Sequence, residues 1–119
     1  MITELKENEI FVFGSNLAGR HGAGAALQAH KDFGAVLGVG EGRTGRCYAF
    51  PTLDGNLRKL PMWRLVDAVN LLYYECVLCP ENRFLLTKVG CGLAGYPESM
   101  MRSLFTNPPR NLILPEDWK

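Results

Sequence analysis

The sequence predicts an α/β fold with a largely parallel sheet. Two observations carry this prediction: short apolar runs of strand length alternate with segments of helical periodicity, and glycine-rich turns separate them. Strands that alternate with helices pair in parallel, because each helix returns the chain to the start of the next strand. The 119 residues contain no repeat or linker, so we expect a single domain over residues 1–119.

The first half of the chain predicts strands on either side of one helix. Ile10 to Phe13 is a continuous apolar run, which is typical of a strand buried on both faces. A helix is expected from Ala23 to about Phe33, with Gly34 as its stop. Three further segments are predicted: a short strand over 35–39, a turn or mobile loop over 38–45, and a strand over 46–52.

The second half predicts two helices and two strands. Pro61 suits the first turn of a helix. The apolar residues that follow recur at three- and four-residue spacing, which indicates one apolar helix face: Met62, Leu65, Val66, Val69, Leu72 and Tyr73. A strand is expected from Phe84 to Val89, a short helix after Pro97, and a last strand over 112–114.

Composition and charge restrict the partners. Thirteen Lys and Arg against twelve Asp and Glu give a formal net charge of +1, so no binding to nucleic acid is expected on this ground. No apolar run has the length of a membrane span and no secretion signal is recognised, so we expect a cytoplasmic protein without membrane contact. The four cysteines form no regular framework, which fits reduced thiols. The sequence leaves the oligomeric state open.

Two glycine-rich loops each follow a predicted strand and lead to a predicted helix. In open α/β sheets, ligands bind at this edge, beyond the carboxyl ends of the strands. The first loop reaches a helix start at Gly22-Ala23-Gly24, where unpartnered backbone N–H groups favour an anion such as phosphate. The second loop, Gly90 to Gly95, repeats this arrangement. We expect the two loops to hold both ends of a diphosphate, with Asn16 facing a sugar.

Glycines at these positions can also have a purely structural use. Tight turns and close packing of helix on sheet both require glycine. No Gly-Lys-Ser/Thr follows either loop, which excludes a P-loop. The run Gly22-Ala23-Gly24 matches a dinucleotide fingerprint only weakly, because the third glycine is missing. A Rossmann-type dinucleotide-binding protein is therefore a minor alternative.

These segments resemble the macrodomain family of ADP-ribose-binding α/β proteins. Residues 11–16 (FVFGSN) and 19–26 are similar to the first strand-and-loop motif of that family. Residues 88–95 (KVGCGLAG) are similar to its second phosphate loop, and residues 111–118 (NLILPEDW) to a common macrodomain C-terminus. The resemblance implies a three-layer α/β/α fold that binds ADP-ribose or an ADP-ribosylated substrate at the sheet edge, with no cofactor.

The resemblance also implies the binding residues. Carried over by position, Asn16 faces the distal ribose, and Gly22, Ala23 and Gly24 line the pyrophosphate. The second loop closes over the phosphates from the other side. The remaining members of the expected ligand-binding set are Ser15, Gly90, Cys91, Gly92, Leu93, Ala94, Gly95 and Tyr96, the last of which is placed to stack on a ribose or base.

Candidate catalytic residues lie in the first loop and after the strand over 46–52. They are Asn16, His21 and Asp54: Asn16 to orient the distal ribose, and His21 or Asp54 to activate a water. Asp54 also begins the strong turn signal Asp-Gly-Asn. The subgroup of macrodomains that cleaves ADP-ribose from glutamate or thymine carries an Asp where this chain has Ala94. A hydrolase of ADP-ribosyl or ADP-ribose-phosphate substrates and a module that binds without turnover therefore both remain.

The cysteines are expected to be structural. Cys91 lies between two glycines before a helix, where loop amides are expected to lower the pKa of its thiol, but no base is assigned to it. Cys76 and Cys79 are spaced as a Cys-x-x-Cys, yet no second pair of ligands lies elsewhere in the chain. We therefore expect no metal site.

Overall fold

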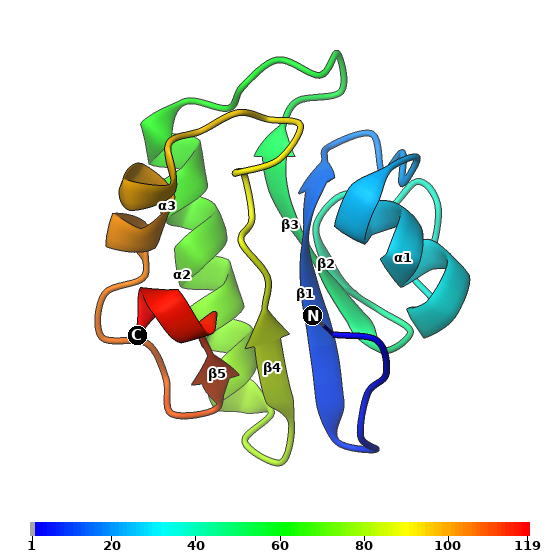
Figure 1. Ribbon diagram of the computed structural model, residues 1–119, viewed down its shortest axis with the longest axis vertical. Coiled ribbons are helices and arrows are strands. Elements are labelled where there is room, and N and C mark those ends of the chain that lie inside the picture. The colour runs from blue at the N-terminus through cyan, green and yellow to red at the C-terminus, as the bar shows by residue number, and fades with distance from the viewer. Residues whose placement is uncertain (1) are drawn as a thin grey trace.

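The computed structural model describes residues 2–119 and contains a five-stranded sheet with three α-helices (Figure 1). The strand order is β2-β3-β1-β4-β5, and only β2 is antiparallel to its neighbour. The strands are β1 (Glu9–Asn16), β2 (Gly42–Thr44), β3 (Cys47–Leu53), β4 (Arg83–Leu86) and β5 (Leu112–Ile113). The predicted α/β fold with a mixed, largely parallel sheet is confirmed.

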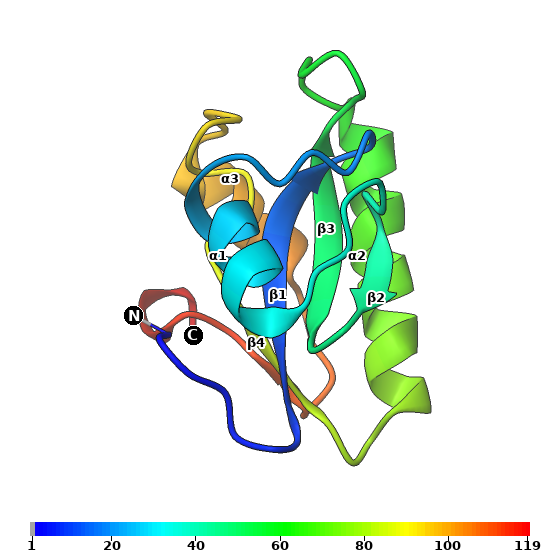
Figure 2. The same cartoon turned by 90° about the vertical axis from the view of Figure 1, so that its right-hand side faces the viewer.

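Helices cover both faces of the sheet. The helix α1 (Gly24–Phe33) packs on one face, where Phe33 lies 5.0 Å from Phe11 between ring centroids. The helices α2 (Met62–Leu78) and α3 (Glu98–Leu104) belong to the core on the other face, together with Val12. Figure 2 shows α1 and α2 on opposite sides of the strands. The expected three layers are therefore present.

The helix boundaries follow the local signals in the sequence. Gly34 ends α1 with a φ of 84°, a left-handed conformation that a residue with Cβ rarely adopts, and its N–H bonds to Ala29 O. Pro61 and Pro97 directly precede α2 and α3, where a missing N–H costs no helical hydrogen bond. Among residues 2–119, no helix combines the length and the hydrophobicity needed to cross a membrane.

The prediction for residues 35–45 was wrong at two places, the strand over 35–39 and residues 42–44 of the predicted loop. Residues 35–39 form no strand: Ala35 is buried against α1, while Val36 and Leu37 are exposed in a turn. The edge strand β2 lies instead at Gly42–Thr44, inside the segment predicted as a loop. Gly-Arg-Thr has no apolar pattern, and antiparallel pairing with β3 makes it a strand.

The connections of the chain diverge at the two central strands. β1 lies between β3 and β4. The chain leaves β1 through α1 and reaches β3 on one side, whereas it leaves β4 through α3 and reaches β5 on the other. In open α/β sheets, a crevice forms where neighbouring connections part in this way. The fold therefore predicts a binding site beyond the carboxyl ends of β1 and β4, which are the strands that the glycine loops follow.

A paired substitution on buried and exposed leucines tests this core. Leu72 of α2 is completely buried between helix and sheet, whereas Leu37 is 57% exposed. Leu72→Ala should lower the free energy of unfolding by about 2–5 kcal/mol, because it leaves a cavity. Leu37→Ala should change it by less than about 0.5 kcal/mol. Urea denaturation followed by circular dichroism measures both, and equal effects would contradict the assigned core.

Candidate functional site

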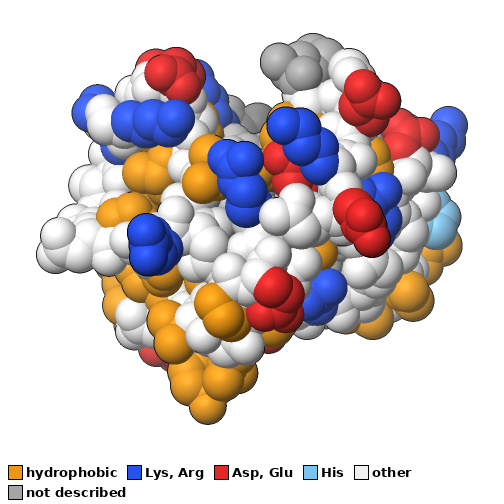
Figure 3. All heavy atoms as spheres, turned by 90° about the horizontal axis from the view of Figure 1, so that it is seen from below, with side chains coloured by type: hydrophobic (Ala, Val, Ile, Leu, Met, Phe, Trp, Pro, Cys, Tyr) orange, Lys and Arg blue, Asp and Glu red, His pale blue; other side chains and the backbone are white. Residues whose placement is uncertain are grey.

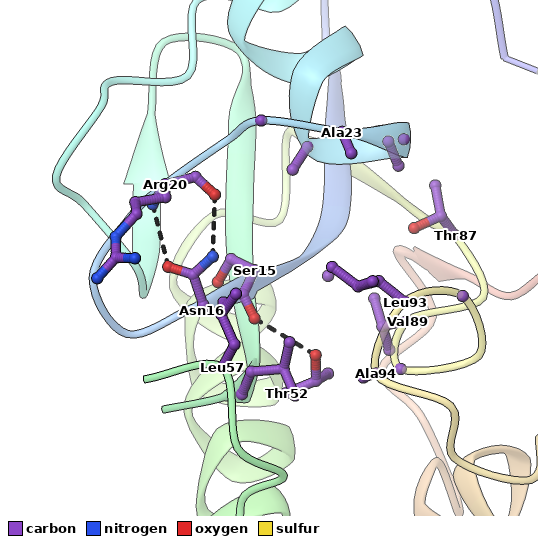
Figure 4. A pocket seen from close by; sticks show the side chains of 18 of the residues that line it. Ser15, Asn16, Arg20, Ala23, Thr52, Leu57, Thr87, Val89, Leu93 and Ala94 are labelled. Atoms are coloured by element: carbon purple, nitrogen blue, oxygen red, sulfur yellow. Dashed lines mark hydrogen bonds between the residues drawn. The ribbon is translucent and has the colours of Figure 1, made fainter. Parts of the chain in front are cut away.

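A cavity of about 670 Å³ lies at the carboxyl ends of β1, β3 and β4 (Figure 4). Its volume is within the roughly 300–1,000 Å³ of typical ligand sites. Both glycine loops line it, with Ala23 at the start of α1 on one side and Leu93 and Ala94 on the other. The close approach of Gly14 in β1 to Gly90 brings the loops together, since a Cβ on Gly14 would lie 3.4 Å from Gly90 N. The structure thus unites two loops that are far apart in the sequence.

The backbone of both loops offers unpaired hydrogen-bond donors to this cavity. The helix α1 begins without a side-chain cap, so its first N–H groups remain open. In the part of the chain that the structure describes, no acceptor is found for the N–H groups of Gly22, Ala23, Gly24, Ala25 and Ala26, nor for those of Gly90, Gly92, Leu93 and Ala94. All of these residues line the cavity.

The N–H groups of the second loop divide into two sets. Those of Cys91, Gly95 and Tyr96 bond to carbonyl oxygens of the chain and close the turn. Gly90 has a φ of 80°, and a Cβ there would press on Met101 and Tyr96 at 3.1 Å. The turn is therefore held by its own hydrogen bonds and by close packing, and the remaining donors are left for a ligand.

Two basic side chains line the cavity, and they differ in their partners. Lys88 Nζ lies 2.7 Å from Asp117 Oδ2 and 3.0 Å from Glu98 Oε1. Hydrogen bonds to Asp117 and Glu98 raise the pKa of the Lys88 ammonium, and the bond to Asp117 has the larger effect. Arg20 donates to the carbonyl oxygen of Gly55 at 2.8 Å, and no carboxylate within residues 2–119 pairs with it. Arg20 is therefore a cation without a carboxylate partner, but its guanidinium points away from the cavity, toward Gly55 outside the lining (Figure 4).

Asn16 and Ser15 line the cavity as predicted, but their polar groups also brace the first loop. Asn16 Nδ2 donates to Arg20 O at 2.9 Å, and Asn16 Oδ1 accepts from Arg20 N at 3.0 Å. The Ser15 hydroxyl donates to Gly40 O. Both side chains are buried. These hydrogen bonds hold the first loop in the conformation that leaves its backbone N–H groups unpaired.

His21 lies outside the cavity lining. Its side chain is 3% exposed, and its ring stands edge-on against Phe13 with 5.1 Å between the centroids. Nε2 lies 3.1 Å from the carbonyl oxygen of Val36, while Nδ1 is buried without a partner among the described residues. The ring anchors the first loop to the core, and the structure does not bring it to the other candidate residues.

Asp54 also lies outside the cavity lining, in the turn after β3. Its Oδ1 accepts the backbone N–H groups of Asn56 at 2.8 Å and of Arg58 at 2.9 Å. These hydrogen bonds hold the pKa of the Asp54 carboxyl below its usual range, and the bond from the Arg58 N–H has the largest effect. Asp54 therefore stabilises the turn, as the Asp-Gly-Asn pattern indicates.

Three residues predicted on the second loop do not line the cavity. Tyr96 is buried, and its hydroxyl donates to Leu60 O at 2.8 Å and Thr52 O at 3.1 Å. Gly95 closes the turn through its N–H. Cys91 is half-buried, and burial raises the pKa of its thiol, so the predicted lowering was wrong. The Tyr96 ring packs against Gly90 of the second loop and does not line the cavity.

The Cys-x-x-Cys pair shows no metal cluster. Cys76 lies on α2 and is buried in the hydrophobic core, and this burial raises the pKa of its thiol to about 12. Cys79, at the end of that helix, lies near Glu75 with Sγ 3.4 Å from Oε2. Within residues 2–119, no group of three His, Cys, Asp or Glu side chains is arranged to hold a metal ion.

Sequence reasoning missed part of the lining. The missed residues with polar or large apolar side chains are Arg20, Thr52, Leu53, Leu57, Thr87, Lys88 and Val89. Thr52 is a polar residue at the end of the strand predicted over 46–52, so its place at the ligand edge was detectable. Thr87 was predicted inside a strand, and it reaches this edge because β4 ends at Leu86. Leu57 has a φ of 63° and reaches the cavity only because of the turn around Asp54. No sequence signal indicates that.

Comparisons with family models, curated proteins and solved structures found no match for this chain. The case for a function therefore rests on the geometry of the cavity and on the residues that form it.

Two substitutions test whether the Asp54 side chain stabilises its turn through hydrogen bonding or through its negative charge. Asp54→Asn keeps an Oδ1 acceptor for both N–H groups and removes the carboxylate, so the melting temperature should stay close to that of the unchanged protein. Asp54→Ala removes the acceptor and should lower the melting temperature. Calorimetric scans measure both. If the two variants melt alike, the turn does not depend on this side chain.

Proposed function

We propose that this chain binds ADP-ribose or a related nucleoside diphosphate sugar in the cavity beyond β1, β3 and β4. One observation carries the proposal: two separate sets of backbone N–H groups without acceptors, at Gly22–Ala26 and at Gly90 with residues 92–94, line the same cavity. A ligand with two neighbouring phosphates offers an acceptor group to each set of donors.

The electrostatics of the cavity favour an anion. The uncapped start of α1 concentrates the positive end of the helix dipole at Gly24. Arg20 has no carboxylate partner and adds positive charge near the cavity, and within residues 2–119 no Asp or Glu lines the cavity. A negative group therefore meets attraction from the helix start, and the carboxylates nearest the lining, Glu98 and Asp117, are paired with Lys88.

The apolar lining suits the rest of a nucleotide. Leu57, on the turn after β3, is 48% exposed, and Leu93, on the second loop, is 82% exposed. Ligand cavities are commonly apolar with a few polar groups that fix orientation. These two leucines offer apolar surfaces for the flat faces of a base or a ribose.

The lining favours binding without turnover. Activation of a water needs a base within hydrogen-bonding reach of the substrate. In the described part of the chain, no Asp, Glu or His side chain lines the cavity. We therefore place the binding module ahead of the hydrolase, which remains the alternative that the resemblance suggested.

Glycine substitutions in the cavity test the proposed binding. A Cβ at Gly22 or Gly92 would meet no protein atom within 4 Å, and neither residue has a left-handed φ. Gly22→Val and Gly92→Val should therefore fold normally but fill the space in front of the donors. We expect each to weaken ADP-ribose binding at least tenfold in calorimetric titration, because the phosphates can no longer approach the backbone.

Gly55→Ala is the control for adding a side chain to a glycine outside the cavity. Gly55 lies outside the cavity lining, and a Cβ there meets only Ala18 at an ordinary 3.9 Å. Its affinity should equal that of the unchanged protein. Titration with AMP and NAD completes the set: tighter binding of NAD than of ADP-ribose would favour the dinucleotide alternative, and no binding of any of them would contradict the proposal.

A turnover assay decides between the two functions. We expect the unchanged protein to bind ADP-ribosylated peptides and to release no free ADP-ribose over hours, because the cavity lacks a side-chain base. Chromatography of the reaction mixture measures the release. Release that Gly22→Val abolishes would instead assign hydrolysis to this cavity.

A further inference from the structure

The outer face of α2 is exposed and apolar. Among the described residues, more than half of the large hydrophobic side chains that are exposed lie on this one helix. The inner face of α2 is used by the core, through Leu65, Val69 and Leu72. In the view of Figure 3, hydrophobic side chains gather at the lower edge, the side on which α2 lies. Helices that only cover a core carry polar residues on the outer face, so this face is shaped for a partner.

The exposed residues form a stripe with a symmetric spacing. We use "α2 stripe" for Trp63, Val66, Asn70, Tyr74 and Val77, all of which are exposed. The steps along it are three, four, four and three residues, so the stripe reads the same in both directions from Asn70. Residues at these spacings share one helix face. Such a surface complements a second copy of itself turned by a half rotation about Asn70.

We propose that two copies of this chain pair through the α2 stripe in an antiparallel, two-fold symmetric dimer. In that arrangement Trp63 of each copy lies against Val77 of the other, and Val66 lies against Tyr74. The two Asn70 amides meet on the axis. A single Asn in an apolar helix interface fixes register, because any shift leaves its amide without a partner.

The exposed area is sufficient for such a dimer. Trp63 and Val77 are 67% and 66% exposed, and Tyr74 is 63% exposed. Val66 and the flanking leucines at 71 and 78 are 40%, 48% and 57% exposed. Together these six side chains expose an area on the order of 700 Å², compared with roughly 300–600 Å² for the largest apolar patch on a typical monomer and roughly 800 Å² per partner in a standard interface.

The charges around the stripe favour an uncharged partner surface. Arg64 is paired with Glu41, and Glu75 lies 3.9 Å from Arg43, so these flanking charges are neutralised within the chain. Asp67 is exposed beside the stripe, three residues from Asn70. In the antiparallel pair the two copies of Asp67 would be about 9 Å apart along the helices, which avoids contact between like charges.

The dimer leaves the cavity free. The helix α2 begins at the edge of the sheet where β3 ends, which is the cavity edge. Antiparallel pairing therefore directs the two cavities to opposite ends of the dimer. Because the proposal does not use the cavity, its failure would leave the proposed ligand binding untouched, and the reverse also holds.

Sedimentation equilibrium tests the pairing. The unchanged protein should show twice the 13.2 kDa mass of one chain, in a concentration-dependent equilibrium. Val77→Glu should weaken the dimer about thirtyfold or more, because it places a charge in an apolar contact. Leu37→Glu is the control, since Leu37 is similarly exposed but lies outside α2, and it should leave the dimer intact. A monomer at every concentration, or an unaffected Val77→Glu dimer, would overturn the proposal.

Cysteine cross-linking tests the register. Asn70→Cys places two thiols on the proposed axis, so mild oxidation should yield a cross-linked dimer on a non-reducing gel. Leu78 is also exposed on α2, so Leu78→Cys serves as the comparison. In the antiparallel pair its two thiols would be about 24 Å apart along the helices, which is too far for a disulfide. The unchanged protein, with its four native cysteines, sets the background. Equal cross-linking at both positions would exclude the antiparallel arrangement.

Discussion

The pairing of β1 with a parallel strand on each side is the constraint on which the rest of the molecule depends. β1 is hydrogen-bonded to β3 along one edge and to β4 along the other, and helices cover both of its faces. Phe11 and Phe13 pack toward α1, while Ile10 and Val12 pack toward the core of α2 and α3. Because β1 and β4 run in the same direction, their following loops must emerge at the same edge. The cavity is the direct consequence of that pairing.

Local signals predicted the parts of the fold that local chemistry determines. Gly34 ends α1 and prolines precede the other two helices, so the helix boundaries could be read from single residues. The strand β2 could not, because Gly-Arg-Thr becomes a strand only through pairing with β3. The position of the glycine loops at the ligand edge was also predictable, since it needs only the order of strand, loop and helix.

The candidate site divides in the same way. Its backbone donors were predictable because glycine at a helix start indicates open N–H groups wherever the helix lies. The roles of side chains were not, because a polar residue in a loop has two possible uses that the sequence does not separate. His21 packs on Phe13, Asp54 caps its own turn, and Tyr96 holds Leu60 by a hydrogen bond. Each was proposed to meet a ligand, and each is engaged in supporting the loops.

This use of side chains explains how so short a chain can present a site made mainly of backbone. A loop with unpaired donors is not stable by itself, since its N–H groups lack the hydrogen bonds that hold ordinary turns. Here Asn16 ties the first loop to itself through Arg20, while the second loop rests on Tyr96 and Met101. The polar and aromatic residues therefore maintain the geometry, and the backbone is left to meet the ligand. Under the proposed function, the backbone recognises charge and shape at the phosphates, and selectivity for the remainder of the ligand comes from the few side chains that reach the cavity, such as Leu57 and Leu93.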